Sequence, residues 1–110
     1  MMKLNTSSES CRQIGRTTLY FAPARARISY ESRSGGETYV TPAARSEEHW
    51  IVLSADRRPL GVLSYCDLER NPWSVRRFTH TMADGSHRAR PLLITAKRPE
   101  DAIIRQGWAA

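Results

Sequence analysis

The middle of the chain carries the most regular pattern of hydrophobic and polar positions. Residues 50–53 are aromatic and β-branched, a short polar loop with a proline follows, and residues 60–66 are again mainly apolar. Two such runs around a short polar loop are typical of an antiparallel hairpin. Asn71-Pro72 then breaks the pattern, because proline cannot donate to a strand ladder. Residues 73–80 form the third expected strand of this region.

The two faces of this third strand differ little in polarity. With a period of two, one face takes Trp73, Val75 and Arg77, and the other takes Ser74, Arg76 and Phe78. Neither face is purely apolar. The pattern predicts a sheet with one packed face and one face that is only partly covered.

The first half of the chain contains shorter signals. Residues 17–21, 25–31 and 38–41 have strand composition. The glycine pair at residues 35–36 favours a hairpin between the last two runs, because glycine adopts a positive φ without steric cost. Residues 42–49 begin with a proline and contain helix-forming side chains, and we expect one helical turn there.

The end of the chain combines a turn, a strand and a helix. The Asp-Gly pair at residues 84–85 predicts a turn, and residues 90–95 predict a last short strand with Pro91 near its beginning, where proline is tolerated. Residues 99–108 predict a helix, with a proline and two acids in the first turn and Gly107 at the C-terminal end. A helix this short must dock on the sheet to be stable.

Together these elements predict an α+β fold, with a small antiparallel sheet of about four to six strands and a short C-terminal helix packed on it. Residues 1–16 are polar and rich in Ser and Thr, and we expect a flexible arm there. Residues 17–110 are expected to form a single α+β domain, because a chain of 110 residues buries one modest core.

Positive charge is unevenly distributed along this chain. The net charge is +6, and residues 70–98 alone carry seven basic side chains against Asp84. Clustered cations suit a polyanion, since each neutralised phosphate releases condensed counterions. The candidate phosphate contacts are five arginines of this segment: Arg70, Arg76, Arg77, Arg88 and Arg90.

Two aromatic side chains, Trp73 and Phe78, interleave with these arginines. Rings that stack on bases, beside arginines that neutralise phosphates, are typical of proteins that bind RNA or single strands. In the alternative interpretation both rings are core residues on opposite sides of a covered sheet, and the arginines lie at its rim. We favour the core for Trp73, and the pattern leaves the role of the arginines open.

The sequence therefore predicts a non-enzymatic nucleic-acid-associated binding module that uses an arginine-rich sheet face on DNA or RNA. The alternative is a small protein-binding inhibitor or adaptor, with an acidic partner such as a nucleic-acid-processing complex. A cationic face attracts nucleic acid and acidic protein alike, so the charge pattern does not separate the two.

Other classes of site have weaker signals. Cys11, Cys66 and the three histidines do not have the spacing of metal ligands. Ser64, Asp67 and His80 are residue types that hydrolases use, but no nucleophile motif frames them. We therefore expect no metal, no cofactor and no catalytic residue.

The lack of long apolar segments predicts a cytoplasmic protein without a membrane partner. The first residues lack the apolar segment of a secretion signal, and no stretch approaches the roughly 20 apolar residues of a membrane helix. In the cytoplasm both cysteines are expected to be reduced. Cys66, which lies in a strand pattern, is expected to be a small buried residue.

Two local resemblances to known families accompany these patterns. The segments ISYESRSGGETYVTP, HWIVL and YCDLERNPWSVRRF resemble parts of a WYL domain, a small β-barrel of bacterial regulators thought to sense nucleic acid or nucleotides; Ile51 stands where that pattern has a tyrosine. The segment IVLSADRRPLGVLSYCDL is similar to the hairpin of a CBS nucleotide-binding domain, without the helix that precedes it there. Each resemblance covers part of the chain, so neither assigns it to a family.

Overall fold

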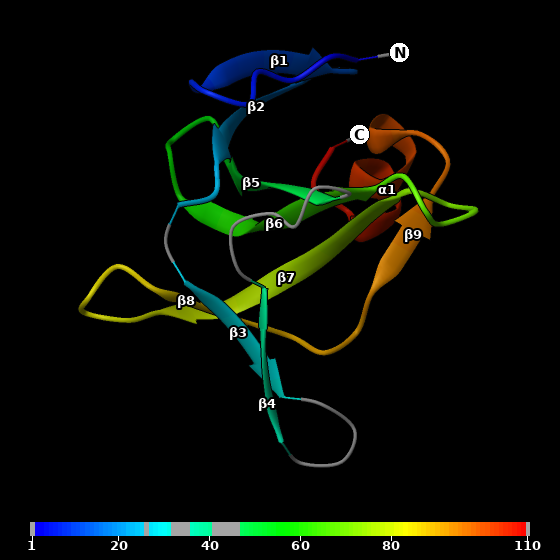
Figure 1. The fold of residues 1–110 in the computed structure, drawn as a ribbon. Coiled ribbons are helices and arrows are strands. Elements are labelled where there is room, and N and C mark those ends of the chain that lie inside the picture. The colour runs from blue at the N-terminus through cyan, green and yellow to red at the C-terminus, as the bar shows by residue number, and fades with distance from the viewer. Residues whose placement is uncertain (1, 26, 32–35, 41–46, 110) are drawn as a thin grey trace.

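The computed structural model describes residues 2–25, 27–31, 36–40 and 47–109 (Figure 1). Within these residues nine strands are followed by one helix. They are β1 (Ser10–Ile14), β2 (Thr17–Pro23), β3 (Ile28–Glu31), β4 (Glu37–Val40), β5 (Glu47–Leu53), β6 (Pro59–Cys66), β7 (Trp73–Thr81), β8 (His87–Ala89), β9 (Ile94–Ala96) and α1 (Pro99–Gln106).

The strands are linked in the order β1-β2-β5-β6-β7-β8-β3-β4, and β9 pairs with β7 beside this path. The pairings are antiparallel, with β3 and β8 as the parallel exception. In Figure 1, α1 lies beside the upper strands, and β3, β4 and β8 extend below β7. The fold class is confirmed as α+β with a mostly antiparallel sheet. The described strands exceed the four to six expected; β1 and β8 lie in segments where the sequence pattern predicts no strand.

The N-terminal residues differ from the expected flexible arm. Residues 10–14 form β1, which pairs with β2 along its whole length, and the side chains of Met2 and Leu4 pack on the core. The carbonyl of Asn5 accepts a hydrogen bond from the indole N–H of Trp50 at 2.8 Å. The alternation of β1 was not recognisable, because a serine occupies one of its two buried positions.

Two other segments differ from the expectations. Residues 47–49 belong to β5 rather than to the helical turn expected over residues 42–49, and the rest of that turn lies outside the described residues. Of the strand expected over residues 90–95, residues 94–95 belong to β9, whereas residues 90–93 are in no strand. Pro91, which has no N–H to donate, lies in this segment between β8 and β9.

The larger core lies between the sheet and α1. Trp50 and Trp73 are in contact there, with ring centroids 5.7 Å apart, and the ring of Tyr65 lies 4.8 Å from that of Trp73. Trp73 is 7% exposed, which confirms its assignment to the core. The largest fully buried side chains of this core are Leu19, Phe21, Val52, Leu63, Val75 and Ile103.

The opposite face of the sheet carries a smaller buried cluster. Ile28, Val62 and Ala89 form it, and Phe78 is partly buried against them. Val62 and Leu63 are neighbours in β6 but belong to different clusters. The sheet is therefore packed on both faces, as alternation along a strand requires.

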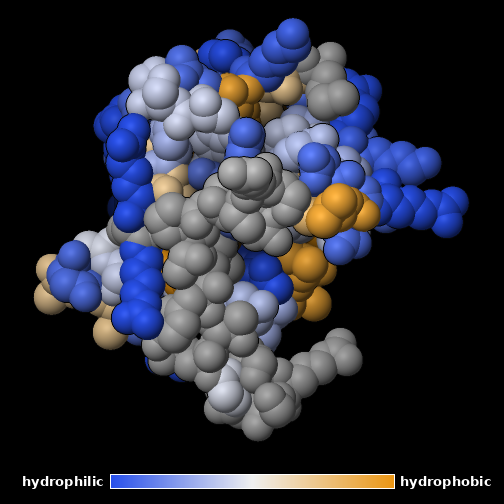
Figure 2. Space-filling model, in the orientation of Figure 1, coloured by the Kyte–Doolittle hydropathy of each residue, from blue (hydrophilic) through white to orange (hydrophobic). Residues whose placement is uncertain are grey.

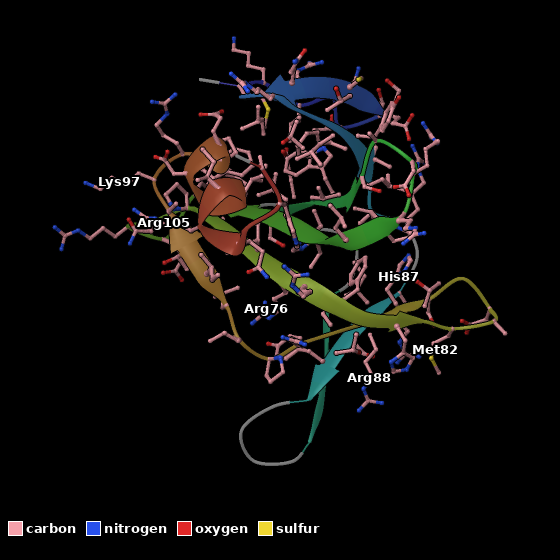
Figure 3. The ribbon with its side chains drawn as sticks, turned by 180° about the vertical axis from the view of Figure 1, so that it is seen from behind. Arg76, Met82, His87, Arg88, Lys97 and Arg105 are labelled. Carbon is pink, nitrogen blue, oxygen red and sulfur yellow. The ribbon has the colours of Figure 1, made fainter. Side chains whose placement is uncertain are left out.

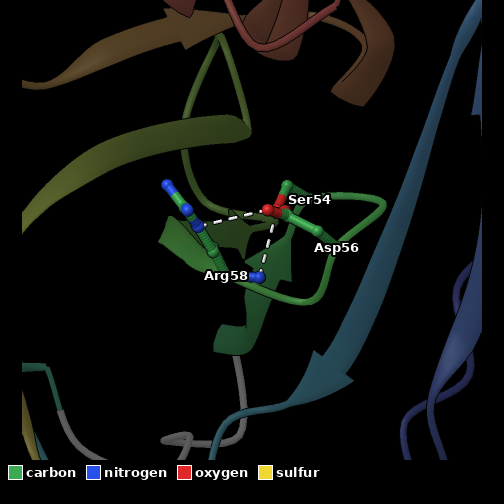
Figure 4. Close-up of polar contacts among 3 residues, drawn as sticks. All are labelled: Ser54, Asp56 and Arg58. Carbon is green, nitrogen blue, oxygen red and sulfur yellow. Dashed lines mark hydrogen bonds and ion pairs between the residues drawn. The ribbon is translucent and has the colours of Figure 1, made fainter.

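A polar turn closes the hairpin of β5 and β6 (Figure 4). The N–H of Ser54 donates to the carbonyl of Arg58 at 2.9 Å, and the N–H of Arg57 donates to the carbonyl of Ser54 at 2.8 Å. The Ser54 hydroxyl donates to the Asp56 carboxylate, which also forms an ion pair with Arg58 at 3.1 Å. The serine hydrogen bond, with a smaller contribution from Arg58, lowers the pKa of Asp56 from its ordinary value. This exposed cluster has its partners within the turn and serves the hairpin.

Helix α1 has the ends that the sequence predicts. A proline opens it, and Gly107 caps it with a φ of 88°, a left-handed conformation that glycine adopts without strain. The N–H of Trp108 donates to the carbonyl of Ile103 at 3.2 Å. The indole of Trp108 packs over Gly61 of β6, where a Cβ would lie 2.6 Å from Trp108 Cη2. Residue 61 must therefore be a glycine for the end of the chain to close on the sheet.

We expect Ile103→Ala to destabilise the fold by about 2–5 kcal/mol, because the substitution leaves a cavity between α1 and the sheet. The side chain of Ile103 is 0% exposed, whereas that of Ile104 in the same helix is 48% exposed. Ile104→Ala is therefore the matched control and should change the free energy of unfolding by less than about 0.5 kcal/mol. Urea denaturation measures both. Equal midpoints for the two variants would show that α1 is not docked through Ile103.

Candidate anion-binding cleft

The candidate site begins with an irregularity at one edge of β7. Both β8 and β9 pair with β7 on the edge opposite β6, at Phe78–Ala89 and at Val75–Ile94. Three residue steps along β7 are therefore matched by five steps between Ala89 and Ile94. The excess takes residues 91–93 out of the ladder, as in a β-bulge, whereas the N–H of Arg90 still donates to the carbonyl of Arg77 at 2.8 Å. The interrupted ladder leaves room on one face of β7.

A cleft of about 530 Å³ opens on this face, within the size range of small-molecule pockets. Four polar side chains line it from neighbouring strands: His49 of β5, Ser64 of β6, Ser74 of β7 and Thr95 of β9. The register pairs His49 with Ser64, Ser64 with Ser74, and Ser74 with Thr95. Residues directly opposite each other point to the same face, with Cβ atoms about 5 Å apart. We call these four residues the polar row.

Two of the three hydroxyls of the polar row, those of Ser74 and Thr95, are available as donors. Ser64 Oγ lies 2.6 Å from His49 Nδ1. Within the described parts of the chain, the hydroxyls of Ser74 and Thr95 form no hydrogen bond. A hydroxyl without an internal partner is left to bond to a ligand or to water.

Arg76 lies two positions along β7 from Ser74 and lines the same cleft. Its guanidinium carbon is 4.0 Å from the centre of the Tyr30 ring, a cation–π geometry. Its Nε is buried without a hydrogen-bond partner, and no described carboxylate forms an ion pair with it. Burial lowers the pKa of Arg76 from its ordinary value, against a smaller raising effect of Tyr30, but an arginine stays charged at neutral pH. The cleft thus contains a half-buried positive charge without a described counter-ion.

The rim of the cleft carries both charge and apolar surface. Arg70 and Glu69, from the segment after β6, and Leu93, from the interrupted ladder, line it. Beside them in the chain, Leu68 and Leu92 are 80% and 71% exposed. Figure 2 shows hydrophobic surface next to strongly hydrophilic side chains on the right-hand side of the molecule.

The structure brings two of the five predicted arginines together. Arg70 and Arg76 line the cleft. Arg77 lies on the opposite face of β7, where its Nη2 donates to the carbonyl of Gln106 at the end of α1 at 3.2 Å. Neighbouring arginines of one strand therefore have different surroundings, and Arg77 is held by the helix.

The remaining two arginines lie outside the cleft. Arg88 belongs to β8, and Arg90 is exposed directly after this strand. Figure 3 shows Arg88 toward one end of the molecule, Lys97 and Arg105 toward the other end near α1, and Arg76 between them. The predicted arginines are thus spread over two faces of the sheet rather than gathered in one patch.

Two features of the cleft were missed in the sequence. Tyr30 reaches Arg76 because β3 joins the sheet through a parallel pairing with β8, and no local pattern predicts that pairing. The polar row depends on the register of four strands. Its one sequence signal is the position of Ser64 and Ser74 at alternating sites of apolar strands.

Both cysteines are free thiols. Cys11 is exposed on β1, and Cys66 is half-buried at the end of β6, where it lines the cleft. The expectation of a buried Cys66 is therefore wrong, because β6 reaches the open cleft at this residue.

Ser64 and His80, two residue types of a catalytic triad, do not contact each other in the structure. The histidine in contact with Ser64 is His49, whereas the ring of His80 lies near Thr79. Among the described residues, no three His, Cys, Asp or Glu side chains are grouped so that they could hold a metal ion. No helix among the described residues is long and apolar enough to cross a membrane.

Comparison with known proteins adds no family. No family model matches the chain, and neither does a curated protein or a solved structure. The resemblances to WYL and CBS domains therefore remain local.

His87 is a buried histidine beside Phe78 of the smaller cluster. His87, at the start of β8, is 8% exposed, and its ring is stacked on Phe78 with centroids 4.4 Å apart. Its Nδ1 lies 2.9 Å from the hydroxyl of Thr81. Burial lowers the pKa of His87 from the ordinary value of 6.5. The folded protein therefore takes up this proton less readily than the unfolded chain does.

We expect acid to destabilise the fold through His87. The contribution is fully present above the ordinary pKa of 6.5. It is lost as the pH falls toward the lowered pKa of the folded state, because the unfolded chain is protonated first. Thermal unfolding between about pH 8 and about pH 5 measures this loss. The loss should shrink in His87→Gln and persist in His80→Gln, which removes an exposed histidine. Equal losses in wild type and both variants would contradict the assignment.

Proposed function

We propose that the protein is a non-enzymatic binding module for single-stranded nucleic acid, and that the cleft at Arg76 and Arg70 contacts its phosphates. The observation that carries the proposal is the half-buried Arg76 guanidinium, which lies against Tyr30 without a described counter-ion. A positive charge that is partly removed from water attracts an anion more strongly than an exposed one does.

The wider charge distribution supports an anionic partner. The net charge is +6. Arg57, Arg58 and Arg98 form ion pairs with neighbouring carboxylates. In the described parts of the chain, none of the five predicted arginines does so. The charges of Arg70 and Arg76 in the cleft are available to phosphates, whose neutralisation releases counterions.

The shape of the cleft favours a single strand over a duplex. Its volume of about 530 Å³ suits one nucleotide. Unpaired bases can stack on aromatic rings and on guanidinium planes, and Tyr30 and Arg76 supply one of each. A duplex holds its bases inside, so it would contact only the rim of the cleft.

The exposed leucines favour the second candidate, a small inhibitor or adaptor that binds an acidic protein. Leu68 and Leu92 are 80% and 71% exposed near the rim, and protein interfaces often surround an apolar centre with charged residues. In that case Arg70 and Arg76 would anchor acidic side chains of a partner, such as a nucleic-acid-processing complex. The free protein would then have no measurable affinity for oligonucleotides at physiological salt.

A salt titration tests the nucleic-acid function. Arg76→Gln should weaken binding of a single-stranded oligonucleotide and reduce the slope of log K against log salt by about 0.7, the value for one lost contact on a single strand. Arg77→Gln is the matched control, because Arg77 lies on the opposite face of β7; it should leave the slope unchanged. Fluorescence anisotropy at a series of salt concentrations measures both variants.

Two exposed arginines provide a second comparison. Arg70→Gln, at the rim, should lower the slope by a similar amount, whereas Arg16→Gln, in the turn between β1 and β2, should not. No binding by wild type even at low salt would exclude the nucleic-acid function and leave the protein partner. Equal slopes for Arg76→Gln and Arg77→Gln would exclude the cleft as the contact.

A further inference from the structure

The polar row has a chemistry that a non-specific cationic groove does not need. Positive charge is sufficient to neutralise a phosphate backbone, yet Ser64, Ser74 and Thr95 place three hydroxyls side by side in the cleft that Arg76 lines. Positions about 5 Å apart allow neighbouring hydroxyls to donate to different oxygens of one tetrahedral anion. The row is thus suited to a compact group with several oxygens.

The contact between His49 and Ser64 can turn the serine into a donor. Their atoms Nδ1 and Oγ lie 2.6 Å apart. When Nδ1 carries the proton, it donates to Ser64 Oγ, and the serine hydroxyl hydrogen is left for a ligand. The other tautomer would use that hydrogen internally. An anion in the cleft favours the first tautomer, because it needs donors.

Tyr30 holds the guanidinium of Arg76 in one orientation, with its carbon 4.0 Å from the ring centre. A planar guanidinium presents a fork of N–H groups, which matches two oxygens of a phosphoryl group. The buried Nε of Arg76 has no hydrogen-bond partner within the described residues. This atom is closed to solvent, so a ligand oxygen would bond to the terminal Nη groups of the fork.

The number of donors around the cleft, rather than its net charge of +1, fits a phosphomonoester better than a phosphodiester. Arg70 and Arg76 contribute two positive charges, and Glu69 contributes one negative charge at the exposed rim. A phosphomonoester carries about −1.5 to −2 charges near pH 7 and has three terminal oxygens. An internal phosphodiester carries one charge and two free oxygens, and would leave part of the polar row unused.

We infer that the cleft recognises a terminal phosphoryl group on a nucleotide, either at the end of a nucleic-acid strand or on a free mononucleotide. The inference rests on the proposed function for the class of ligand and adds the group that is recognised. Arg76, Ser74 and Thr95 donate to the phosphoryl oxygens, and Arg70 contributes charge at the rim.

The experiment compares the ends of one strand. An oligonucleotide with an internal fluorophore is prepared with a 5′-phosphate, with a 3′-phosphate, or with hydroxyls at both ends, and a nucleoside 5′-monophosphate serves as competitor. One phosphorylated end should bind about tenfold more tightly than the hydroxyl-ended strand, the effect of one charge-assisted set of hydrogen bonds.

Variants of the polar row show where this preference arises. Ser74→Ala and Thr95→Val each remove one hydroxyl without a change in charge, and each should reduce the preference about fivefold. Thr79→Val removes a hydroxyl of β7 outside the cleft and should keep the preference. Arg76→Lys keeps the charge but loses the fork, and should reduce the preference as well.

The two cysteines give a readout of where the ligand binds. Cys66 lines the cleft, and Cys11 is exposed on β1. A ligand with a terminal phosphate should slow the alkylation of Cys66 and leave that of Cys11 unchanged. Mass spectrometry of the alkylated protein measures both rates in one sample.

The outcomes separate the inference from the proposed function. Equal affinity for phosphorylated and hydroxyl ends, or an unchanged preference in both polar-row variants, overturns the inference and leaves the nucleic-acid function standing. Binding of the mononucleotide without binding of any strand supports the phosphoryl site and overturns the nucleic-acid function. No binding of any ligand, with Cys66 unprotected, overturns both.

Discussion

Strand β7 is the element on which the rest of the structure depends. It pairs with β6 and β9 along its first half and with β8 along its second half, so it joins the strands beside α1 to those that carry β3 and β4. Its period of two sends Val75 into the larger core and Phe78 into the smaller cluster. A shift of register by one residue would exchange the two faces, and both clusters would lose their apolar side chains together.

The same strand explains why the cleft is polar and open. Phe78 still packs on the smaller cluster, but Arg76 and Ser74, the next positions on this face, lie where residues 91–93 are out of the ladder. Apolar cover at this point would bury hydroxyls and a guanidinium without partners, which costs more than their exposure to water. The interrupted ladder and the polar side chains are therefore one feature of the fold.

Local patterns predict the elements whose signal lies within one segment. The hairpin of β5 and β6, strand β7 and the two ends of α1 follow from alternation, proline and glycine. The cleft depends on contacts between distant segments, so the sequence shows its charge but not its geometry. Arg76 and Arg77 look alike in the sequence, and the contact of Arg77 with Gln106 separates them. Tyr30 meets Arg76 through a parallel pairing of β3 with β8, and the register of four strands assembles the polar row.

We expect the partly buried guanidinium of Arg76 to lower the stability of the protein without a bound anion. Its guanidinium is partly removed from water, its Nε is unpaired within the described residues, and the contact with Tyr30 returns about 0.5–2 kcal/mol. A well-packed apolar side chain at such a position is often neutral or stabilising. An anion beside the Arg76 guanidinium offsets part of this cost through its charge, and binding then stabilises the folded state. The burial that weakens the empty cleft is thus the same property that would make it bind an anion more tightly than the exposed arginines do.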